Sequence, residues 1–88
     1  MKIVYTSQFK RDFKKARKQN KDIEKLRIAI NRLLSGETLD SSYRDHPLIS
    51  NLKGYRECHV TPDWLLIYKL TSEELLLVRV GSHSELFK

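Results

Sequence analysis

The sequence predicts an α+β fold, β-α-α-β-β-β, in which a two-helix hairpin packs on one face of a small twisted sheet. Two observations lead to this prediction. Two stretches near the N-terminus repeat apolar residues with the spacing of helices. Three strand-like runs near the C-terminus are separated by only two or three residues, so their strands form an antiparallel meander. With 88 residues, the chain has room for one domain, which we place at residues 1–88.

The N-terminal part of the chain predicts one strand followed by two helices. Residues 2–6, KIVYT, are apolar and β-branched, as in short strands. Ser7 can then cap a first helix through its hydroxyl. Gly36 is a stop signal for a second helix. Each helix has an apolar stripe, formed by Phe9, Phe13 and Ala16 in the first and by Leu26, Ala29, Ile30 and Leu33 in the second.

The C-terminal half predicts a loop and then the meander. Residues 36–50 lack periodicity and are rich in turn-forming residues, which predicts a loop. Strands are expected at about 54–60, 63–70 and 74–80. The tail turns away at Gly81. The short links between the three strands fix them as neighbours in one sheet.

The charge balance favours a polyanionic partner. Lys and Arg number 17 against 11 Asp and Glu, which gives a net charge of +6 and a pI near 9.6. RNA, DNA, an acidic membrane surface or an acidic protein would each suit this excess, and so would a role in solubility alone.

Cysteine usage and hydropathy indicate a protein of the cytoplasm. The one cysteine, Cys58, cannot form an internal disulfide, which fits a reducing compartment. The longest fully apolar stretch is WLLIY at 64–68, far short of the ~20 residues that a membrane span needs. We therefore expect no membrane association and no processing of the chain.

Three histidines and the cysteine raise the question of a metal site, and their spacing argues against one. Cys58 and His59 are adjacent on a predicted strand, so their side chains point to opposite faces. His46 and His83 complete no paired-ligand motif with them. We expect no metal and no cofactor.

Two of the histidines have neighbours that suggest a functional role. His46 precedes Pro47, which holds its backbone extended. His59 shares a strand face with Glu57, and Asp63 follows across the turn. A hairpin brings strand ends into contact, so His59 and Asp63 are expected to be close, with the carboxylate fixing the imidazole tautomer.

Arg79 interrupts the apolar run LLLVRV of the last strand. A buried charge needs a partner, so Arg79 either pairs with Glu57 or Asp63 or faces an open cleft. In a cleft it can grip a phosphate through two parallel hydrogen bonds. A bend at Gly81 can bring His83 back over the sheet edge.

Two aromatic residues can belong either to the core or to a binding site. Trp64 lies at the entry of its strand, on the same face as Leu66 and Tyr68, for which core packing is expected. Phe87 lies near the end of the chain, where it can plug the core or stack on a base.

Imidazoles, a carboxylate and an arginine gathered by one basic domain suit phosphodiester cleavage. One base takes a proton from the attacking hydroxyl, one acid protonates the leaving oxygen, and one cation holds the charge that develops on the phosphate. RNA supplies its own nucleophile in the 2′-hydroxyl.

Three stretches resemble the YafQ branch of the RelE/ParE superfamily, the ribosome-dependent mRNA interferases of bacterial toxin–antitoxin pairs. They are YRDHPL, LKGYRECHVTPDWLLIYKL and VRVGSHSELF, and the resemblance covers nearly the whole chain. It implies the β-α-α-β-β-β fold and cleavage of mRNA in the ribosomal A site without a metal. The implied partners are the ribosome, mRNA and a cognate acidic antitoxin. The free toxin would be a monomer that forms a higher assembly with its antitoxin.

The resemblance also implies roles for individual residues. We assign His46 as general base and His83 as general acid. Asp63 would orient an imidazole, His59 would help to position the phosphate, and Arg79 would stabilise its charge. Substrate-binding aromatic residues and a basic face that docks on ribosomal RNA complete the expected site: Trp64 and Phe87 for the former, and Lys10, Arg11, Lys14, Lys15 and Lys18 for the latter.

Two other classes of function remain open at this point. The ParE branch shares the fold and poisons gyrase by binding, without cleavage. A basic nucleic-acid-binding module that represses transcription with its antitoxin is a further possibility. The three histidines at the positions of the family motifs favour cleavage.

Overall fold

Five strands form one mixed sheet in the order β1-β5-β4-β3-β2. The structure is a computed structural model that describes residues 1–87, so the last residue of the predicted domain lies outside it. β1 runs parallel to β5, and every other pair of neighbours is antiparallel. The strands are β1 (Lys2–Tyr5), β2 (His46–Pro47), β3 (Arg56–Thr61), β4 (Trp64–Leu70) and β5 (Glu74–Gly81).

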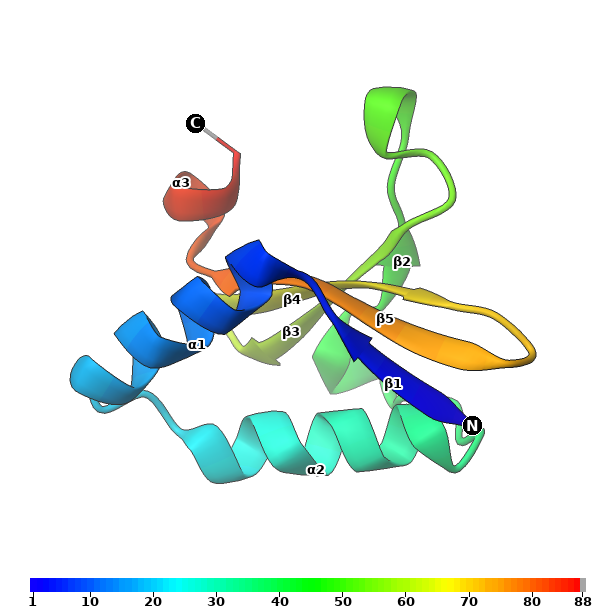
Figure 1. The fold of residues 1–88 in the computed structure, drawn as a ribbon, viewed down its shortest axis with the longest axis horizontal. Helices are drawn as coiled ribbons and strands as arrows, with labels where there is room; N and C mark the ends of the chain where they lie inside the picture. Colours follow the sequence, from blue (N-terminus) through cyan, green and yellow to red (C-terminus); the bar gives the residue numbers. More distant parts are fainter. Residues whose placement is uncertain (88) are drawn as a thin grey trace.

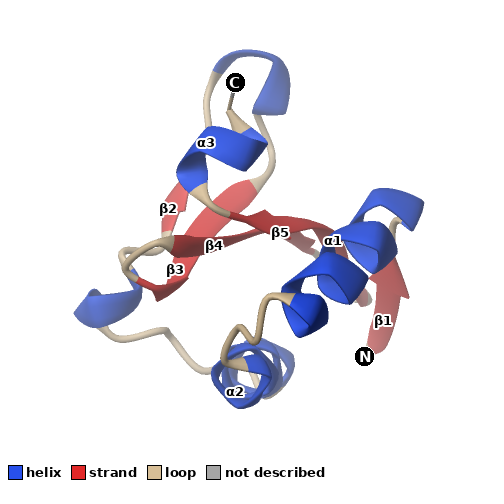
Figure 2. Ribbon diagram, turned by 90° about the vertical axis from the view of Figure 1, so that its left-hand side faces the viewer, coloured by secondary structure: helices blue, strands red, loops and turns tan. Residues whose placement is uncertain are grey.

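The helices lie on both sides of this sheet. The long helices α1 (Ser7–Lys18) and α2 (Ile23–Leu34) form a hairpin on one side, and the short helix α3 (His83–Leu86) rises on the other. The segment between β2 and β3, which contains a 3₁₀ turn at Ser50–Leu52, projects on the same side as α3 (Figures 1 and 2). A second 3₁₀ turn spans Ser41–Tyr43. The predicted α+β class, helix hairpin and antiparallel meander are confirmed.

The core lies between the helix hairpin and the sheet. Side chains at alternate positions of the strands point toward the apolar stripes of the helices. This follows from the repeat of two residues in a strand and of about 3.6 residues in a helix. Phe13 of the predicted stripe is half-buried against this core. The buried contributors are Phe9 and Ala16 from α1, Leu26 and Leu33 from α2, Leu39 from the segment after α2, and Cys58, Val60, Trp64, Leu66, Tyr68, Leu75, Leu77 and Val80 from the strands.

Two local predictions need correction, and one short element was not predicted. Thr6, and not Ser7, caps α1, because the Thr6 hydroxyl accepts the backbone N–H of Phe9 at 2.9 Å. The expected loop at 36–50 contains a 3₁₀ turn and the two-residue strand β2, which were too short to show periodicity. The tail beyond Gly81 forms α3. Gly36 stands as expected just beyond α2, with a φ of 80° that glycine adopts without strain.

Irregularities in two strands change which residues face each other. Between His59 and Thr61 of β3, one extra residue breaks the pairing with β4. On β5, Leu77 pairs with Tyr68 and Arg79 pairs with Ile67, so Val78 is the extra residue. Such β-bulges redirect the side chains that follow them.

Two further findings bear on the composition. No helix within residues 1–87 is long and apolar enough to cross a membrane.

Cys58 is completely buried on the helix side of β3, and this burial raises the pKa of its thiol to about 12. The thiol is therefore protonated and shielded at neutral pH.

Candidate active site

Most of the polar residues singled out in the sequence gather on the sheet face that points away from the helix hairpin. His46 of β2 lies opposite Glu57 of β3, Glu57 lies opposite Ile67 of β4, and Ile67 lies opposite Arg79 of β5. Residues directly opposite in antiparallel strands share a face. The four side chains therefore form one row across the sheet, with His46 at one end and Arg79 at the other.

A second row runs beside the first and leads to α3. His59 lies opposite Leu65, which lies opposite Gly81 at the end of β5. His83, the first residue of α3, follows two positions later. The second row thus connects the imidazole of His59 with the element that carries His83.

One carboxylate serves two imidazoles in these rows. The Glu57 Oε1 atom lies 3.2 Å from His46 Nε2 and 3.7 Å from His59 Nε2. The Glu57 side chain is only 7% exposed, whereas those of His46 and His59 are 49% and 20% exposed. A buried carboxylate of this kind fixes the orientation and tautomer of the imidazoles it contacts.

The same three side chains could also hold a metal ion. Each offers one ligand atom, and these atoms of His46, Glu57 and His59 all lie within 4.8 Å of one another. Two imidazoles and a carboxylate are common ligands of zinc and other divalent ions. The spacing of Cys58 and His59 in the sequence did not indicate these three possible metal ligands, because His46 lies on β2 whereas Glu57 and His59 lie on β3. The absence of a metal stays a prediction.

A hydrogen-bonded network anchors the segment that carries His46. Asp45 accepts from the Tyr68 hydroxyl at 2.6 Å and from the Nε and Nη2 atoms of Arg56, both at 3.3 Å. Burial and the adjacent Asp45 carboxylate raise the pKa of Tyr68, so its hydroxyl remains a donor. The backbone of Arg44 is left-handed, with a φ of 47°. The network fixes the residue before His46 to the centre of the sheet.

The predicted pairing of His59 with Asp63 is wrong. The Nδ1 atom of His59 lies 3.4 Å from the carbonyl oxygen of Pro62, and Nε2 faces Glu57. Asp63 is exposed in the turn, and no ion pair within residues 1–87 involves it. The bulge before the turn ends the regular pairing of β3 with β4. His59 and Asp63 are therefore not paired, although they lie on either side of the same turn.

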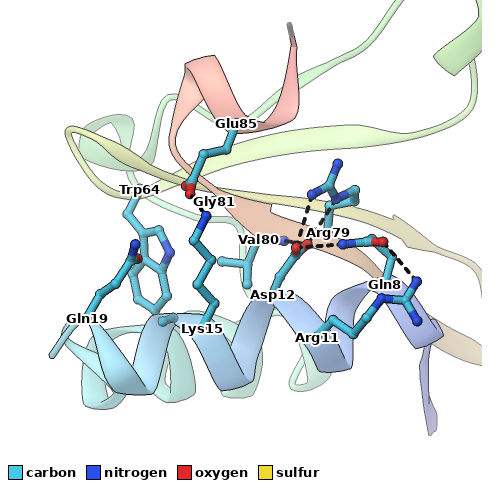
Figure 3. A pocket seen from close by; sticks show the side chains of 11 residues that line it. Gln8, Arg11, Asp12, Lys15, Gln19, Trp64, Arg79, Val80, Gly81 and Glu85 are labelled. Atoms are coloured by element: carbon cyan, nitrogen blue, oxygen red, sulfur yellow. Dashed lines mark hydrogen bonds and ion pairs between the residues drawn. The ribbon is translucent and has the colours of Figure 1, made fainter.

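Arg79 pairs with Asp12 of α1, and neither Glu57 nor Asp63 is its partner. Its Nε and Nη2 atoms donate to the Asp12 carboxylate at 2.9 and 3.0 Å (Figure 3). The Arg79 side chain is 31% exposed, so it keeps access to the solvent while it is paired. Figure 3 shows this pair in a hollow of about 260 Å³ between α1, the end of β5 and α3.

α3 is fastened to the sheet and to α1. Ser82 and Glu85 form a capping box, in which the Ser82 hydroxyl accepts the Glu85 N–H and the Glu85 carboxylate accepts the Ser82 N–H. Lys15 of α1 donates to Glu85 at 2.5 Å, and this bond with the Ser82 N–H lowers the pKa of Glu85 to about 2. His83 is exposed, and its ring centroid lies 5.1 Å from that of Phe87.

Gly81 lets α3 approach the end of β5 closely. A Cβ atom at this position would lie 3.1 Å from Leu86 Cδ2 and 3.2 Å from Glu85 Oε1. Such contacts are tight, so the ends of the Leu86 and Glu85 side chains would have to move slightly to make room for a Cβ atom. The glycine thus leaves room for the Leu86 and Glu85 side chains of α3 beside the end of β5.

The two aromatic residues predicted to bind substrate, Trp64 and Phe87, lie in different environments. Trp64 is 2% exposed and packs in the core, yet its side chain also lines the hollow of Figure 3, so its predicted role in substrate binding stays a prediction. Its strand position puts it on the helix side, with Leu66 and Tyr68. Phe87 is half-buried beside His83, a position from which it can still shape a binding surface.

The basic face of α1 is present as predicted, with one exception. Lys10, Arg11, Lys14 and Lys18 are exposed. Lys15 is also 59% exposed, but its ammonium is engaged by Glu85, so it links α1 to α3.

Three residues of this region were not identified as site residues from the sequence: Glu57, Asp45 and Asp12. Glu57 is the one charged residue among residues 1–87 that is buried. A glutamate inside a predicted half-buried strand was the feature of the sequence that could have identified it. Asp12 sits among the basic residues of α1, where only the position of β5 reveals its partner. Asp45 lies in a stretch without periodicity.

A basic α+β domain that presents imidazoles, a carboxylate and an arginine on one sheet face has the residue types of a nucleic-acid-cleaving protein. The comparisons with known proteins identify it further. The model of the family described as "Bacterial toxin of type II toxin-antitoxin system, YafQ" matches residues 1–88. The chain belongs to this family.

Individual relatives are similar over almost their whole length. The mRNA interferase toxin YafQ of Escherichia coli BL21-DE3 is 48% identical over 97% of this chain and 94% of the relative. The toxin in a crystal structure of the E. coli DinJ–YafQ complex is 47% identical, with a TM-score of 0.92 over 98% of this chain and 97% of that one. A metal-bound toxin from Helicobacter pylori is 40% identical, with a TM-score of 0.91 over 99% of both chains.

Proposed function

We propose that this toxin is an mRNA interferase, a ribosome-dependent endoribonuclease that inhibits translation by cutting mRNA in the A site. The observation that carries the proposal is the row His46–Glu57–Ile67–Arg79 on the sheet face opposite the helix hairpin, together with His59 beside it. The toxin would act in the cytoplasm, where ribosomes and mRNA are found.

The proposed reaction is an internal transesterification. The 2′-oxygen attacks the adjacent phosphorus, the bond between phosphorus and the 5′-oxygen breaks, and the products carry a 2′,3′-cyclic phosphate and a 5′-hydroxyl. His46 takes the 2′-proton as general base, and His83 gives a proton to the leaving oxygen as general acid. Arg79 stabilises the charge on the phosphate. The proton removed and the proton delivered balance, so no water is consumed, and the proposed reaction uses no metal.

Glu57 takes the orienting role that the sequence assigned to Asp63. Its carboxylate contacts both His46 and His59 and is itself shielded from solvent. A carboxylate that holds two imidazoles keeps one positioned as a base and the other near the phosphate. Asp63, exposed in the turn, would at most contact the RNA from outside these rows.

The proposed partners follow from the charge of the molecule. The exposed cations Lys10, Arg11, Lys14 and Lys18 of α1 would dock on ribosomal RNA, because such a face tracks phosphates. An acidic antitoxin would neutralise the toxin. The E. coli relative is known in complex with DinJ. The free toxin would be a monomer, and the complex with antitoxin a higher assembly.

Primer extension tests this proposal. An mRNA translated in a purified system should be cut within the reading frame when the protein is present and should remain intact when it is absent. EDTA at a concentration that spares ribosomal magnesium, or a chelator selective for zinc and copper, should leave the cut unchanged. If translation continues and DNA gyrase is inhibited in a supercoiling assay instead, the ParE-like alternative is correct.

A further inference from the structure

The bulge in β5 turns Arg79 toward the site. Without the bulge, the register that starts from the pair Leu77 and Tyr68 would place Val78 opposite Ile67, and Arg79 would point into the core. With the bulge, Leu77 and Val80 remain buried on the helix side while Arg79 joins the opposite sheet face. The chain thus uses an irregular strand to place a cation in line with Glu57 and His46.

Asp12 lies where the sheet has no further strand. β1 accompanies β5 only as far as Leu77, the partner of Tyr5. Beyond this point α1 borders β5: the Thr6 hydroxyl donates to the Val78 carbonyl at 2.6 Å, and the backbone N–H of Val80 donates to Asp12 Oδ2 at 3.2 Å. Asp12 therefore supplies the acceptor that a neighbouring strand would otherwise provide.

The Asp12 carboxylate is held firmly. Besides Val80 and Arg79, the Nε2 atom of Gln8 donates to Oδ1 at 3.0 Å, and the side chain is only 9% exposed. Burial alone would raise the pKa of Asp12, but the hydrogen bonds from Arg79, Gln8 and Val80 outweigh burial and hold this pKa below its usual value. The carboxylate is ionised and immobile at neutral pH.

Asp12 occupies one edge of the Arg79 guanidinium and leaves another edge accessible. A guanidinium carries five N–H donors. Asp12 accepts from Nε and from one N–H of Nη2. Within residues 1–87, no side-chain hydrogen bond uses Nη1 or the second N–H of Nη2. Two of these three donors, the second N–H of Nη2 and one N–H of Nη1, form the end-on fork that binds a phosphate through two parallel bonds. In Figure 3 the guanidinium stands on the side of Asp12 away from α1.

We propose that Asp12 is a positioning residue that fixes the rotamer of Arg79, so that the end-on fork of the guanidinium is presented to the scissile phosphate. This role rests on the proposed function, in which Arg79 binds that phosphate. Asp12 itself does not touch the RNA. The sequence presented an ion pair and a phosphate contact as alternatives for Arg79. In this proposal the guanidinium makes both, each through a different edge.

The physical advantage is preorganisation. An unpaired arginine on a strand samples many rotamers, and ordering them during the reaction weakens its contact with the transition state. A cation already fixed by a buried carboxylate needs no reordering when charge develops on the phosphate. A displacement of about 1 Å in a positioned group can cost a rate factor on the order of 100.

The test compares Asp12→Asn with the matched variant Thr6→Val. Both substitutions weaken the link between α1 and β5, but only Asp12→Asn removes the charge that pairs with Arg79. Thr6→Val instead removes the contact with the Val78 carbonyl and the cap of α1. Single-turnover cleavage at saturating toxin should slow about 10- to 100-fold for Asp12→Asn, with ribosome affinity within about 2-fold of wild type. Thr6→Val should lower the melting temperature and leave the saturated rate constant unchanged.

Chemical rescue separates positioning from stability. Arg79→Ala should regain cleavage when guanidinium ion is added at a concentration well below denaturing levels, compared with equal sodium chloride. This rescue requires Asp12 to hold the ion, so it should be absent from the double variant Asp12→Asn/Arg79→Ala.

The outcomes distinguish this proposal from the one on which it rests. If the wild-type protein cleaves no mRNA, the proposed function fails and the role of Asp12 falls with it. If the wild-type protein cleaves mRNA and Asp12→Asn cleaves it equally fast, only the positioning role is overturned. The same holds if Thr6→Val and Asp12→Asn have equal melting temperatures and lose equal amounts of cleavage rate.

Discussion

Glu57 shows how much a single buried side chain can decide at the residue scale. It contributes nothing to the apolar core, yet it is almost inaccessible to solvent and contacts two imidazoles through one oxygen. A charge in such a position is unfavourable unless its partners compensate it. The fold thus retains a carboxylate where an apolar residue would stabilise the sheet more simply.

Glu57→Gln should therefore impair cleavage much more than folding. The amide has the same shape, but it cannot hold both imidazoles in the orientation that a carboxylate imposes. We expect the saturated cleavage rate to fall about 100-fold or more, with a change in unfolding free energy on the order of 1 kcal/mol. Single-turnover kinetics and thermal denaturation check the two effects. An unchanged rate would remove Glu57 from the site, and Glu73→Gln, at an exposed position, is the control.

His83→Gln should abolish cleavage for a different reason. The leaving oxygen needs a proton donor, and glutamine is not an acid. The side chain is exposed at the start of α3, so its removal should alter the melting temperature little. Growth arrest at matched expression measures the effect in cells. A variant that still arrests growth would show that His83 is not the acid.

The sequence revealed the residue types of the site better than their partners. His46, His59 and Arg79 stood out because they interrupt apolar patterns or precede a proline. Their partners did not, since pairing of Arg79 with Asp12 spans 67 positions and depends on a one-residue bulge. No local pattern encodes such a bulge, and the two carboxylates expected beside Arg79 and His59 were consequently the wrong ones.

At the scale of elements, strongly periodic segments were predictable and very short ones were not. α1, α2 and the three meander strands have enough residues to show a period. β2 has two residues and depends on its pairing with β3, and α3 has four residues held by a capping box and by Lys15 of α1. These two short elements carry His46 and His83, and for this reason the geometry of the site could not be read from the sequence.

The attachment of α3 should depend on pH through Glu85. Its pKa is about 2 in the folded protein and about 4.5 in an unfolded chain, because Lys15 and the Ser82 N–H favour the carboxylate. A lowered folded-state pKa contributes stability that is complete above the unfolded value and is lost as the pH falls from about 4.5 toward 2.

We therefore expect wild type to exceed Glu85→Gln in unfolding free energy by about 1 kcal/mol at neutral pH, a small value because the ion pair is partly exposed. The difference should shrink below pH 4.5 and vanish near pH 2. Denaturant titrations of both proteins across this range measure it. A difference that persists at pH 2 would mean that the ionised carboxylate is not its source.

The basic face of α1 should govern salt-dependent binding to the ribosome. Replacing Lys10, Lys14 and Lys18 with Glu removes cations that would release counterions from RNA. Ribosome affinity should fall, and its dependence on salt concentration should become flatter. The same change at Lys2, Lys25 and Lys53 provides the control. An equal effect of both triple variants would mean that net charge, and not this face, determines docking.

At the scale of the whole molecule, the charge of +6 on so small a body shapes how partners approach. Long-range attraction raises the rate of encounter, whereas the lifetime of a complex depends on contacts that exclude water. An acidic antitoxin should therefore be steered toward this toxin and then retained by apolar anchors.

Raising salt should slow association with the antitoxin much more than it speeds dissociation. Screening acts over the ~8–10 Å Debye length at 0.10–0.15 M salt and barely affects desolvated contacts. Surface plasmon resonance or stopped-flow measurements at two ionic strengths separate the two rates. A salt effect mainly on dissociation would show that exposed ion pairs hold the complex together.

The burial of Cys58 makes this toxin ready for site-specific labelling. Its thiol is inaccessible and, with a pKa of about 12, hardly forms the nucleophile that maleimides require. A single substitution at an exposed position away from the site, such as Ser72→Cys in the β4–β5 turn, should then accept one fluorophore without removal of the native cysteine. Single-molecule fluorescence could follow one toxin from its antitoxin to a translating ribosome, with Cys58 still at its place in the core.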